Sequence, residues 1–110
     1  MRVVTHQITF TADEADLIDE KKVYSLLDGI VAQAELTKVN EVTHRFSPQG
    51  ISIVYVLAES HIAIHTWPED TCAYVTLSSC GDDTFSSEKT TRLISSIFGN
   101  KSVNIQKVSS

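Results

Sequence analysis

The sequence lacks three features that would place it in a large class of proteins. No apolar run approaches the roughly 20 residues that a membrane-spanning helix needs, and the N-terminus lacks the apolar segment of a secretory signal. Basic residues are scarce, with 9 Lys and Arg against 14 Asp and Glu. Nucleic acids and anionic membranes both favour a basic surface. We therefore expect a cytoplasmic protein with neither nucleic acid nor a membrane as its partner.

Cysteine is also scarce, because the chain has only Cys72 and Cys80. Their even spacing within a predicted strand puts both side chains on one face, about 26 Å apart along it. That separation is far beyond the reach of a disulfide. Reduced thiols are typical of the cytoplasm, so we expect both cysteines to be free.

The sequence does contain a clear pattern of apolar residues. In some segments they recur every two residues, as in strands, and in others every 3.6 residues, as in helices. The 110 residues fit one domain, 1–110. Strands are predicted over 4–10, 37–46, 51–58, 61–67, 73–77 and 103–108, and helices from Asp19 to Ala34 and from Ser86 or Ser87 to Gly99. This order favours an α+β fold, a two-layer α/β sandwich with an antiparallel sheet and two helices on one face. Dimerisation is one way to cover the other face.

The stretch from Leu57 to Glu69, LAESHIAIHTWPE, places polar residues within an apolar, strand-like run. Buried polar groups without partners are costly, so these residues need an explanation. His61 and His65 stand four residues apart, which is about 13 Å on a strand. Two ligands of one zinc ion each lie about 2 Å from the metal. We therefore predict no metal site, and we expect a structural hydrogen bond for His61.

Taken singly, the candidate residues have ordinary interpretations. Ser60 is typical of a turn and Glu69 of a solvated loop, while Phe46 and Trp67 are typical of a core. Cys80, at a strand end, is a candidate thiol nucleophile beside a histidine base. Cysteine is also a common small buried residue, so the residue types alone leave both interpretations open.

Read together, the segment Glu59–Glu69 (ESHIAIHTWPE), with Cys80-Gly81 eleven residues later, resembles the pyruvoyl-dependent S-adenosylmethionine decarboxylases of bacteria and archaea. It is similar to their short, single-domain class, most closely over Phe46–Glu69. The resemblance implies self-cleavage between Glu59 and Ser60, which would give chains 1–59 and 60–110. The cofactor would be a pyruvoyl group generated from Ser60, and the product, decarboxylated S-adenosylmethionine, would donate aminopropyl groups for spermidine synthesis.

The resemblance also implies how the remaining residues take part in catalysis. His65 would be the acid–base group of processing, assisted by Ser52, and we expect two adjacent strands to bring Ser52, Ser60 and His65 together. The keto group would form a Schiff base with the substrate amine and accept the electrons left by carbon dioxide. Cys80 would then protonate the substrate carbon.

Substrate binding and assembly are implied in the same way. Phe46 and Trp67 would flank the adenine, where aromatic rings stack and attract the cationic sulfonium. Glu69 would hold the ribose hydroxyls. The short members of the family are homodimers with two active sites at or near the subunit interface.

The sequence departs from the family pattern at Val4, where glycine is usual, and at Phe10 and Thr76, where aspartate is usual. Relatives of the same fold decarboxylate arginine or ornithine through pyruvoyl chemistry, so these changes keep an alternative substrate open. A second alternative is an unprocessed, non-catalytic dimer that binds a nucleotide.

Overall fold

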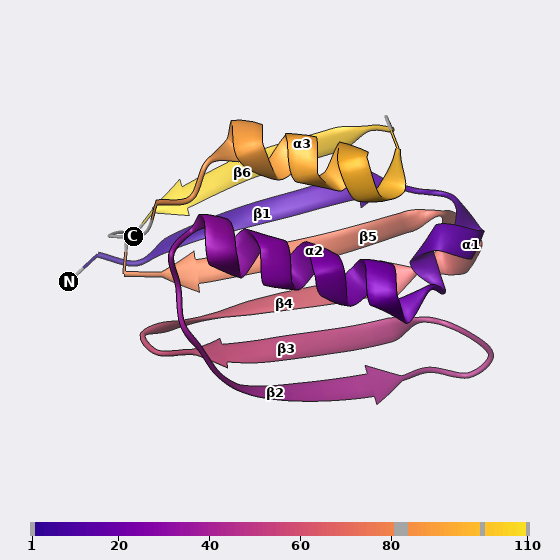
Figure 1. The fold of residues 1–110 in the computed structure, drawn as a ribbon, viewed down its shortest axis with the longest axis horizontal. Coiled ribbons are helices and arrows are strands. Elements are labelled where there is room, and N and C mark those ends of the chain that lie inside the picture. The colour runs from indigo at the N-terminus through magenta and orange to yellow at the C-terminus, as the bar shows by residue number, and fades with distance from the viewer. Residues whose placement is uncertain (1, 81–83, 100, 110) are drawn as a thin grey trace.

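The computed structural model describes residues 2–80, 84–99 and 101–109. The strands are β1 (Val4–Thr11), β2 (Lys38–Arg45), β3 (Ile51–Leu57), β4 (Ser60–Trp67), β5 (Cys72–Ser79) and β6 (Val103–Ser109). The helices are α1 (Glu14–Leu17), α2 (Glu20–Gln33), the 3-10 helix η1 (Pro68–Asp70) and α3 (Ser87–Phe98). The strands form one antiparallel sheet in the order β2-β3-β4-β5-β1-β6 (Figure 1).

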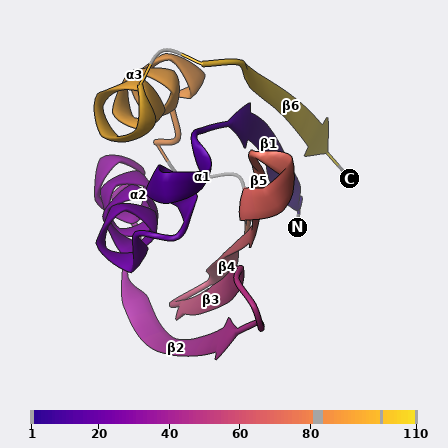
Figure 2. The ribbon, with the colours of Figure 1, turned by 90° about the vertical axis from the view of Figure 1, so that its right-hand side faces the viewer.

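The structure confirms the predicted two-layer sandwich, since α2 and α3 lie on the same side of the sheet (Figure 2). Alternation along the strands sends one set of side chains toward these helices, and Ile53, Ile64 and Val75 are fully buried there. The apolar stripe of α2 packs against them and includes Leu26 and Leu27. Each such buried aliphatic side chain stabilises the fold by about 1.5–3 kcal/mol.

The two main helices begin where the sequence predicts. The Asp19 carboxylate accepts a hydrogen bond from the Lys21 backbone N–H, and the Ser86 side chain accepts one from the Lys89 backbone N–H. Each bond satisfies a backbone donor that the helix itself leaves unpaired. Gly29 then allows α2 and α3 to approach, because a Cβ at this position would lie 2.6 Å from Leu93 Cδ2.

Two local features lie outside the predicted strands and helices. The short helix α1 precedes the first main helix and buries Leu17. Residues 47–50 connect β2 to β3 and include a cis Ser47–Pro48 bond. None of the helices in the described ranges is long and apolar enough to cross a membrane.

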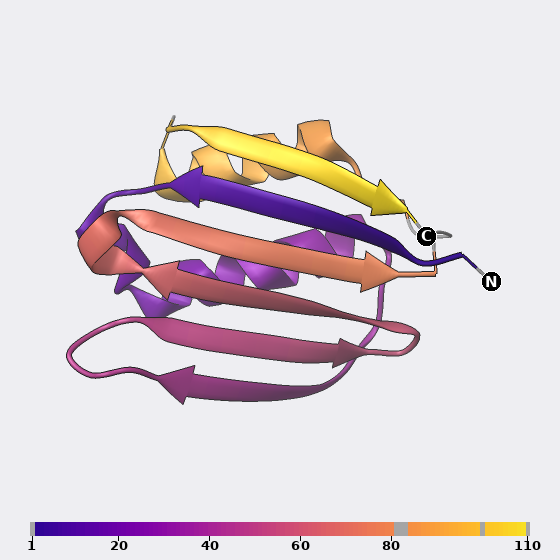
Figure 3. The same ribbon diagram turned by 180° about the vertical axis from the view of Figure 1, so that it is seen from behind.

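The second face of the sheet carries no helix (Figure 3). We call it the open face. Several large apolar side chains are exposed on it: Val42 is 67% exposed, Phe46 51%, Val56 47% and Trp67 42%. A single chain therefore leaves an apolar surface uncovered, and surfaces of this kind often mark interaction sites.

Candidate functional site

Ser52 and His65 form a hydrogen-bonded pair on the open face. They are directly opposite each other in the register of β3 and β4, and the Ser52 hydroxyl lies 2.6 Å from His65 Nδ1. Adjacent antiparallel strands bring such cross-strand partners together. Because Nδ1 is held by the hydroxyl, the imidazole has a defined orientation, which is what an acid–base group requires.

A cavity of about 290 Å³ opens beside this pair. Its lining residues are Phe46, Gln49, Gly50, Ser52, His65, Thr66, Trp67 and Glu69. They come from the β2–β3 loop, from the facing strands β3 and β4 and from η1, so we call this space the hairpin cavity. Gly50 allows the loop to turn here, because its φ is +111° and a Cβ would lie 3.3 Å from the Thr66 carbonyl oxygen. Two exposed aromatic rings and one carboxylate thus surround a histidine.

A second cavity, of about 220 Å³, lies at the other end of β4. Its lining residues are Ala34, Glu35, Leu36, Glu59, Ser60, Ser79, Cys80 and Thr84. We call it the serine cavity. The Cys80 thiol donates to the carbonyl oxygen of Glu59 at 3.6 Å. A donor at this oxygen polarises the carbonyl of the Glu59–Ser60 peptide bond.

The Ser60 hydroxyl is the most unusual polar group in the serine cavity. Its oxygen is buried and has no hydrogen-bond partner among the residues that the structure describes. Leaving a buried hydroxyl unsatisfied costs about 1–3 kcal/mol, so such a group in a native protein needs an explanation, and a catalytic role is one of them. The hydroxyl therefore lies next to a polarised peptide carbonyl with no competing hydrogen bond.

The expectation that Ser52, Ser60 and His65 meet within one chain is wrong. Ser60 pairs with Leu57 at the β3–β4 turn, whereas His65 lies five residues further along β4, about 16 Å away. The alternation of the strand also separates them, because Ser60 shares the face of Ile62 and Ile64 while His65 points to the open face. In Figure 1 these ends of β4 lie at opposite sides of the sheet.

The histidines and cysteines of the described residues lie apart from one another as potential metal ligands. Within residues 2–80, 84–99 and 101–109, no three His, Cys, Asp or Glu side chains are grouped as metal ligands. Cys72 and Cys80 are both free thiols on β5 or at its end. His61 lies exposed on the open face, and the structural hydrogen bond expected for it stays a prediction.

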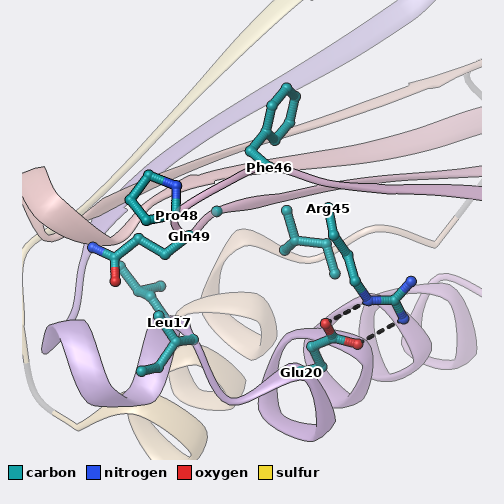
Figure 4. A pocket seen from close by; sticks show the side chains of 9 residues that line it. Leu17, Glu20, Arg45, Phe46, Pro48 and Gln49 are labelled. Atoms are coloured by element: carbon teal, nitrogen blue, oxygen red, sulfur yellow. Dashed lines mark hydrogen bonds and ion pairs between the residues drawn. The ribbon is translucent and has the colours of Figure 1, made fainter.

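Sequence reasoning missed a further hollow on the helix side of the β2–β3 loop (Figure 4). Arg45 donates two hydrogen bonds to the Glu20 carboxylate there, at 2.6 and 2.8 Å. This bond to Arg45 lowers the pKa of the Glu20 carboxyl. Phe46 and Gln49 line this hollow as well as the hairpin cavity, from which the loop separates it. No sequence motif indicates such a contact, because α1, α2 and the loop meet only in the folded chain.

Comparison with known proteins agrees with this arrangement. A family profile described as S-adenosylmethionine decarboxylase matches residues 9–110. The chain is 43% identical over 75 residues to the S-adenosylmethionine decarboxylase proenzyme of Prochlorococcus marinus, and the match covers 68% of this chain and 60% of that protein. It is 45% identical over 71 residues to the proenzyme of the same name from Aquifex aeolicus, with 64% and 51% covered. The match thus spans only half to three fifths of these curated relatives.

A solved structure extends the similarity to nearly the whole chain. The crystal structure of the adenosylmethionine decarboxylase from Aquifex aeolicus superimposes with a TM-score of 0.76. The superposition covers 98% of this chain and 88% of the other, at 29% sequence identity. The predicted sheet and helix arrangement is therefore shared with a solved member of the family.

Proposed function

The chain belongs to the S-adenosylmethionine decarboxylase family, and from this premise we propose that it cleaves itself and then decarboxylates S-adenosylmethionine. The observation that carries the proposal is the buried, unpartnered Ser60 hydroxyl next to the Glu59 carbonyl. Its relatives carry the name proenzyme, which is consistent with a chain that must be processed. Cleavage would give chains 1–59 and 60–110.

The cleavage step follows from the groups around the Glu59–Ser60 bond. The Ser60 oxygen attacks the Glu59 carbonyl carbon, and the amide nitrogen leaves as the Ser60 amine, so an ester replaces the amide. The Cys80 thiol, 3.6 Å from the carbonyl oxygen, would stabilise the negative charge that develops on that oxygen. A base then removes the Ser60 α-proton, which releases the Glu59 carboxylate and leaves a dehydroalanine. Tautomerisation and addition of water expel ammonia.

The new N-terminal pyruvoyl group would supply an electron sink for the loss of carbon dioxide. The residues around Ser60 fit such a group, since the serine cavity has room beside the hydroxyl and a thiol within reach. In the decarboxylation step we assign Cys80 the return of a proton to the substrate carbon. Phe46 and Trp67 would hold the adenine between them, and Glu69 would accept hydrogen bonds from the ribose hydroxyls.

We further propose that a second copy of the chain completes each active site. A base acts through a contact of about 3 Å, which His65 cannot make to Ser60 of its own chain. The open face is apolar enough to be covered by another protomer. A two-fold axis across the strands would set the hairpin cavity of one copy against the β3–β4 turn of the other, and the Ser60 side chain would turn from the helix side of that turn toward the interface. Ser52 and His65 of one copy would then serve Ser60 of its partner.

The structure also bears on the alternative substrates. Val4 and Phe10, two of the departures that motivated arginine or ornithine, are each 2% exposed and belong to the core. Neither lines the hairpin cavity or the serine cavity, and Thr76 does not line them either. These substitutions therefore do not reshape a substrate pocket within the chain. The names of the relatives favour S-adenosylmethionine.

Intact mass spectrometry of the purified protein tests the proposal. We expect two fragments, 1–59 and 60–110, with the second carrying a pyruvoyl N-terminus that shifts in mass on reaction with hydroxylamine. Ser60→Ala should stay whole, while Ser96→Ala, a change of the same kind on the exposed side of α3, should be cleaved like the wild type. A wild-type chain that stays whole after prolonged incubation would refute self-processing. If that whole chain still bound adenosine compounds, the non-catalytic alternative would replace our proposal.

Substrate choice is tested separately by release of labelled carbon dioxide. The processed protein is offered S-adenosylmethionine, arginine and ornithine side by side. We expect release from S-adenosylmethionine alone. Release from arginine or ornithine in its place would overturn the substrate assignment and leave the cleavage chemistry intact.

A further inference from the structure

Gln49 has an arrangement that the proposed chemistry does not use. It is half-buried on the loop between β2 and β3 and lines the hairpin cavity. Its side-chain nitrogen Nε2 donates to two carboxylates, to Glu14 Oε2 at 2.9 Å and to Glu69 Oε2 at 3.5 Å. Both partners can only accept when ionised, so the chemistry requires the amide nitrogen, not its oxygen, on this side.

The amide brings together three segments that are distant in the sequence. Glu14 begins α1, Gln49 belongs to the β2–β3 loop and Glu69 lies in η1. Because one nitrogen reaches both carboxylates, two negative charges lie within two hydrogen-bond lengths of each other. A neutral donor between them offsets part of their repulsion and holds each carboxylate in one orientation.

The two hydrogen bonds are unequal, and the inequality has a consequence for ligand binding. The short bond to Glu14 anchors the amide to α1. The bond to Glu69 is at the long limit for a hydrogen bond, so Glu69 Oε2 is oriented but weakly held. A ribose hydroxyl can donate a hydrogen bond to that carboxylate oxygen, and only the weak bond from Gln49 is then lost.

We infer that Gln49 is a positioning residue that orients the Glu69 carboxylate for the ribose diol of the substrate nucleoside. This inference rests on the proposed role of Glu69. It assigns to the loop a contribution to substrate affinity, since the chemical step occurs at the serine cavity, away from Gln49. Loss of the amide should therefore raise KM and leave kcat unchanged.

The test uses processed enzyme, with the extent of cleavage of each variant measured by mass. Gln49→Leu should raise the KM for S-adenosylmethionine by roughly five- to tenfold, with kcat within about twofold of wild type. Gln49→Glu should raise KM further than Gln49→Leu, because it replaces the neutral donor between the two carboxylates with a third carboxylate. Lys89→Leu is the control, since Lys89 is exposed on α3, on the side of the sheet away from the open face, and lines neither the hairpin cavity nor the serine cavity; its KM should equal that of the wild type.

Glu14→Gln separates positioning of Glu69 from a simple tether between the loop and α1. It weakens the short bond and leaves the contact of Gln49 with Glu69, so KM should stay within about twofold of wild type. In the Gln49→Leu background, the same Glu14→Gln change should recover part of the lost affinity, because it removes one of the two repelling charges. A KM increase in Glu14→Gln equal to that of Gln49→Leu would overturn the inference, since only the tether would then matter.

Inhibition by adenosine and by 2′,3′-dideoxyadenosine distinguishes failure of this inference from failure of the proposed function. Wild-type enzyme should prefer adenosine, and Gln49→Leu should reduce that preference. If Glu69→Gln reduces it and Gln49→Leu does not, the positioning role is refuted while the role of Glu69 stands. If Glu69→Gln itself leaves the preference unchanged, the proposed ribose contact is wrong, and the inference falls with it.

Discussion

The separation of Ser60 and His65 predicts that two inactive variants restore cleavage when they are paired. Five residues of β4 separate these side chains, or about 16 Å at the rise of a strand, and a base works over about 3 Å. Ser60→Ala and His65→Ala chains should each stay whole when expressed alone. In a mixed dimer, Ser60 of the His65→Ala chain meets the intact His65 of the other copy. With equal amounts and random pairing, about half of the His65→Ala chains enter mixed dimers, and nearly all of the His65→Ala chains in those dimers should be cleaved.

Co-expression with two different affinity tags provides the assay. Sequential purification isolates the mixed dimer, and intact mass reports which of the two chains is cut. The matched control pairs His65→Ala with a Ser60→Ala/His65→Ala double variant, which supplies no histidine and should give no cleavage. An isolated mixed dimer whose His65→Ala chain stays whole would refute the shared site. Cleavage of His65→Ala by itself would instead show that this histidine is not the base of processing.

Three further predictions concern the scaffold. Ile64→Ala should lower the free energy of unfolding by about 2–5 kcal/mol, measured by urea denaturation, because this side chain is fully buried under the helices; an effect below about 1 kcal/mol would contradict the packing described. Ser86→Ala should cost about 1 kcal/mol through loss of the bond from the Lys89 backbone N–H, and Ser86→Asp, which keeps an acceptor, should retain most of the stability. Burial, followed by the charge of Asp70, raises the pKa of the Cys72 thiol. The alkylation rate of Cys72, measured by peptide mass mapping, should therefore be half-maximal at a higher pH than the rate of a free cysteine. Half-maximal alkylation at a lower pH would contradict the raised pKa of this thiol.

Hydrophobic period determined the layers of this fold. Residues that alternate along the first strand are buried in the structure, as Val4, Ile8 and Phe10 are. Residues at helical spacing, such as Leu26 and Ile30, are buried on the helix that faces them. Such patterns are local, because side-chain direction repeats every two residues on a strand and every 3.6 on a helix. The short helix α1 was missed for the same reason, since four residues are too few to show a period.

The exposed positions of the aromatic residues illustrate the limit of a residue-by-residue interpretation. Phe46 and Trp67 are usually core residues by type, yet both are about half exposed on the open face. Sequence periodicity assigns a side chain to one of two faces but does not say which face a helix covers. The resemblance to the family instead implies that both rings flank the adenine of the substrate, and this role stays a prediction.

By itself, the sequence determined the family and the strand and helix order, and it singled out the small set of residues around Glu59–Ser60 that we propose to carry the chemistry. The tertiary structure alone decided how those residues are divided between two cavities. Neighbouring strands bring Ser52 and His65 into contact, but the same extended backbone keeps Ser60 at the far end of β4 and on the other face. Spacing along a chain does not specify distance until the conformation is known, and an extended strand separates residues that a helix or a turn would bring together.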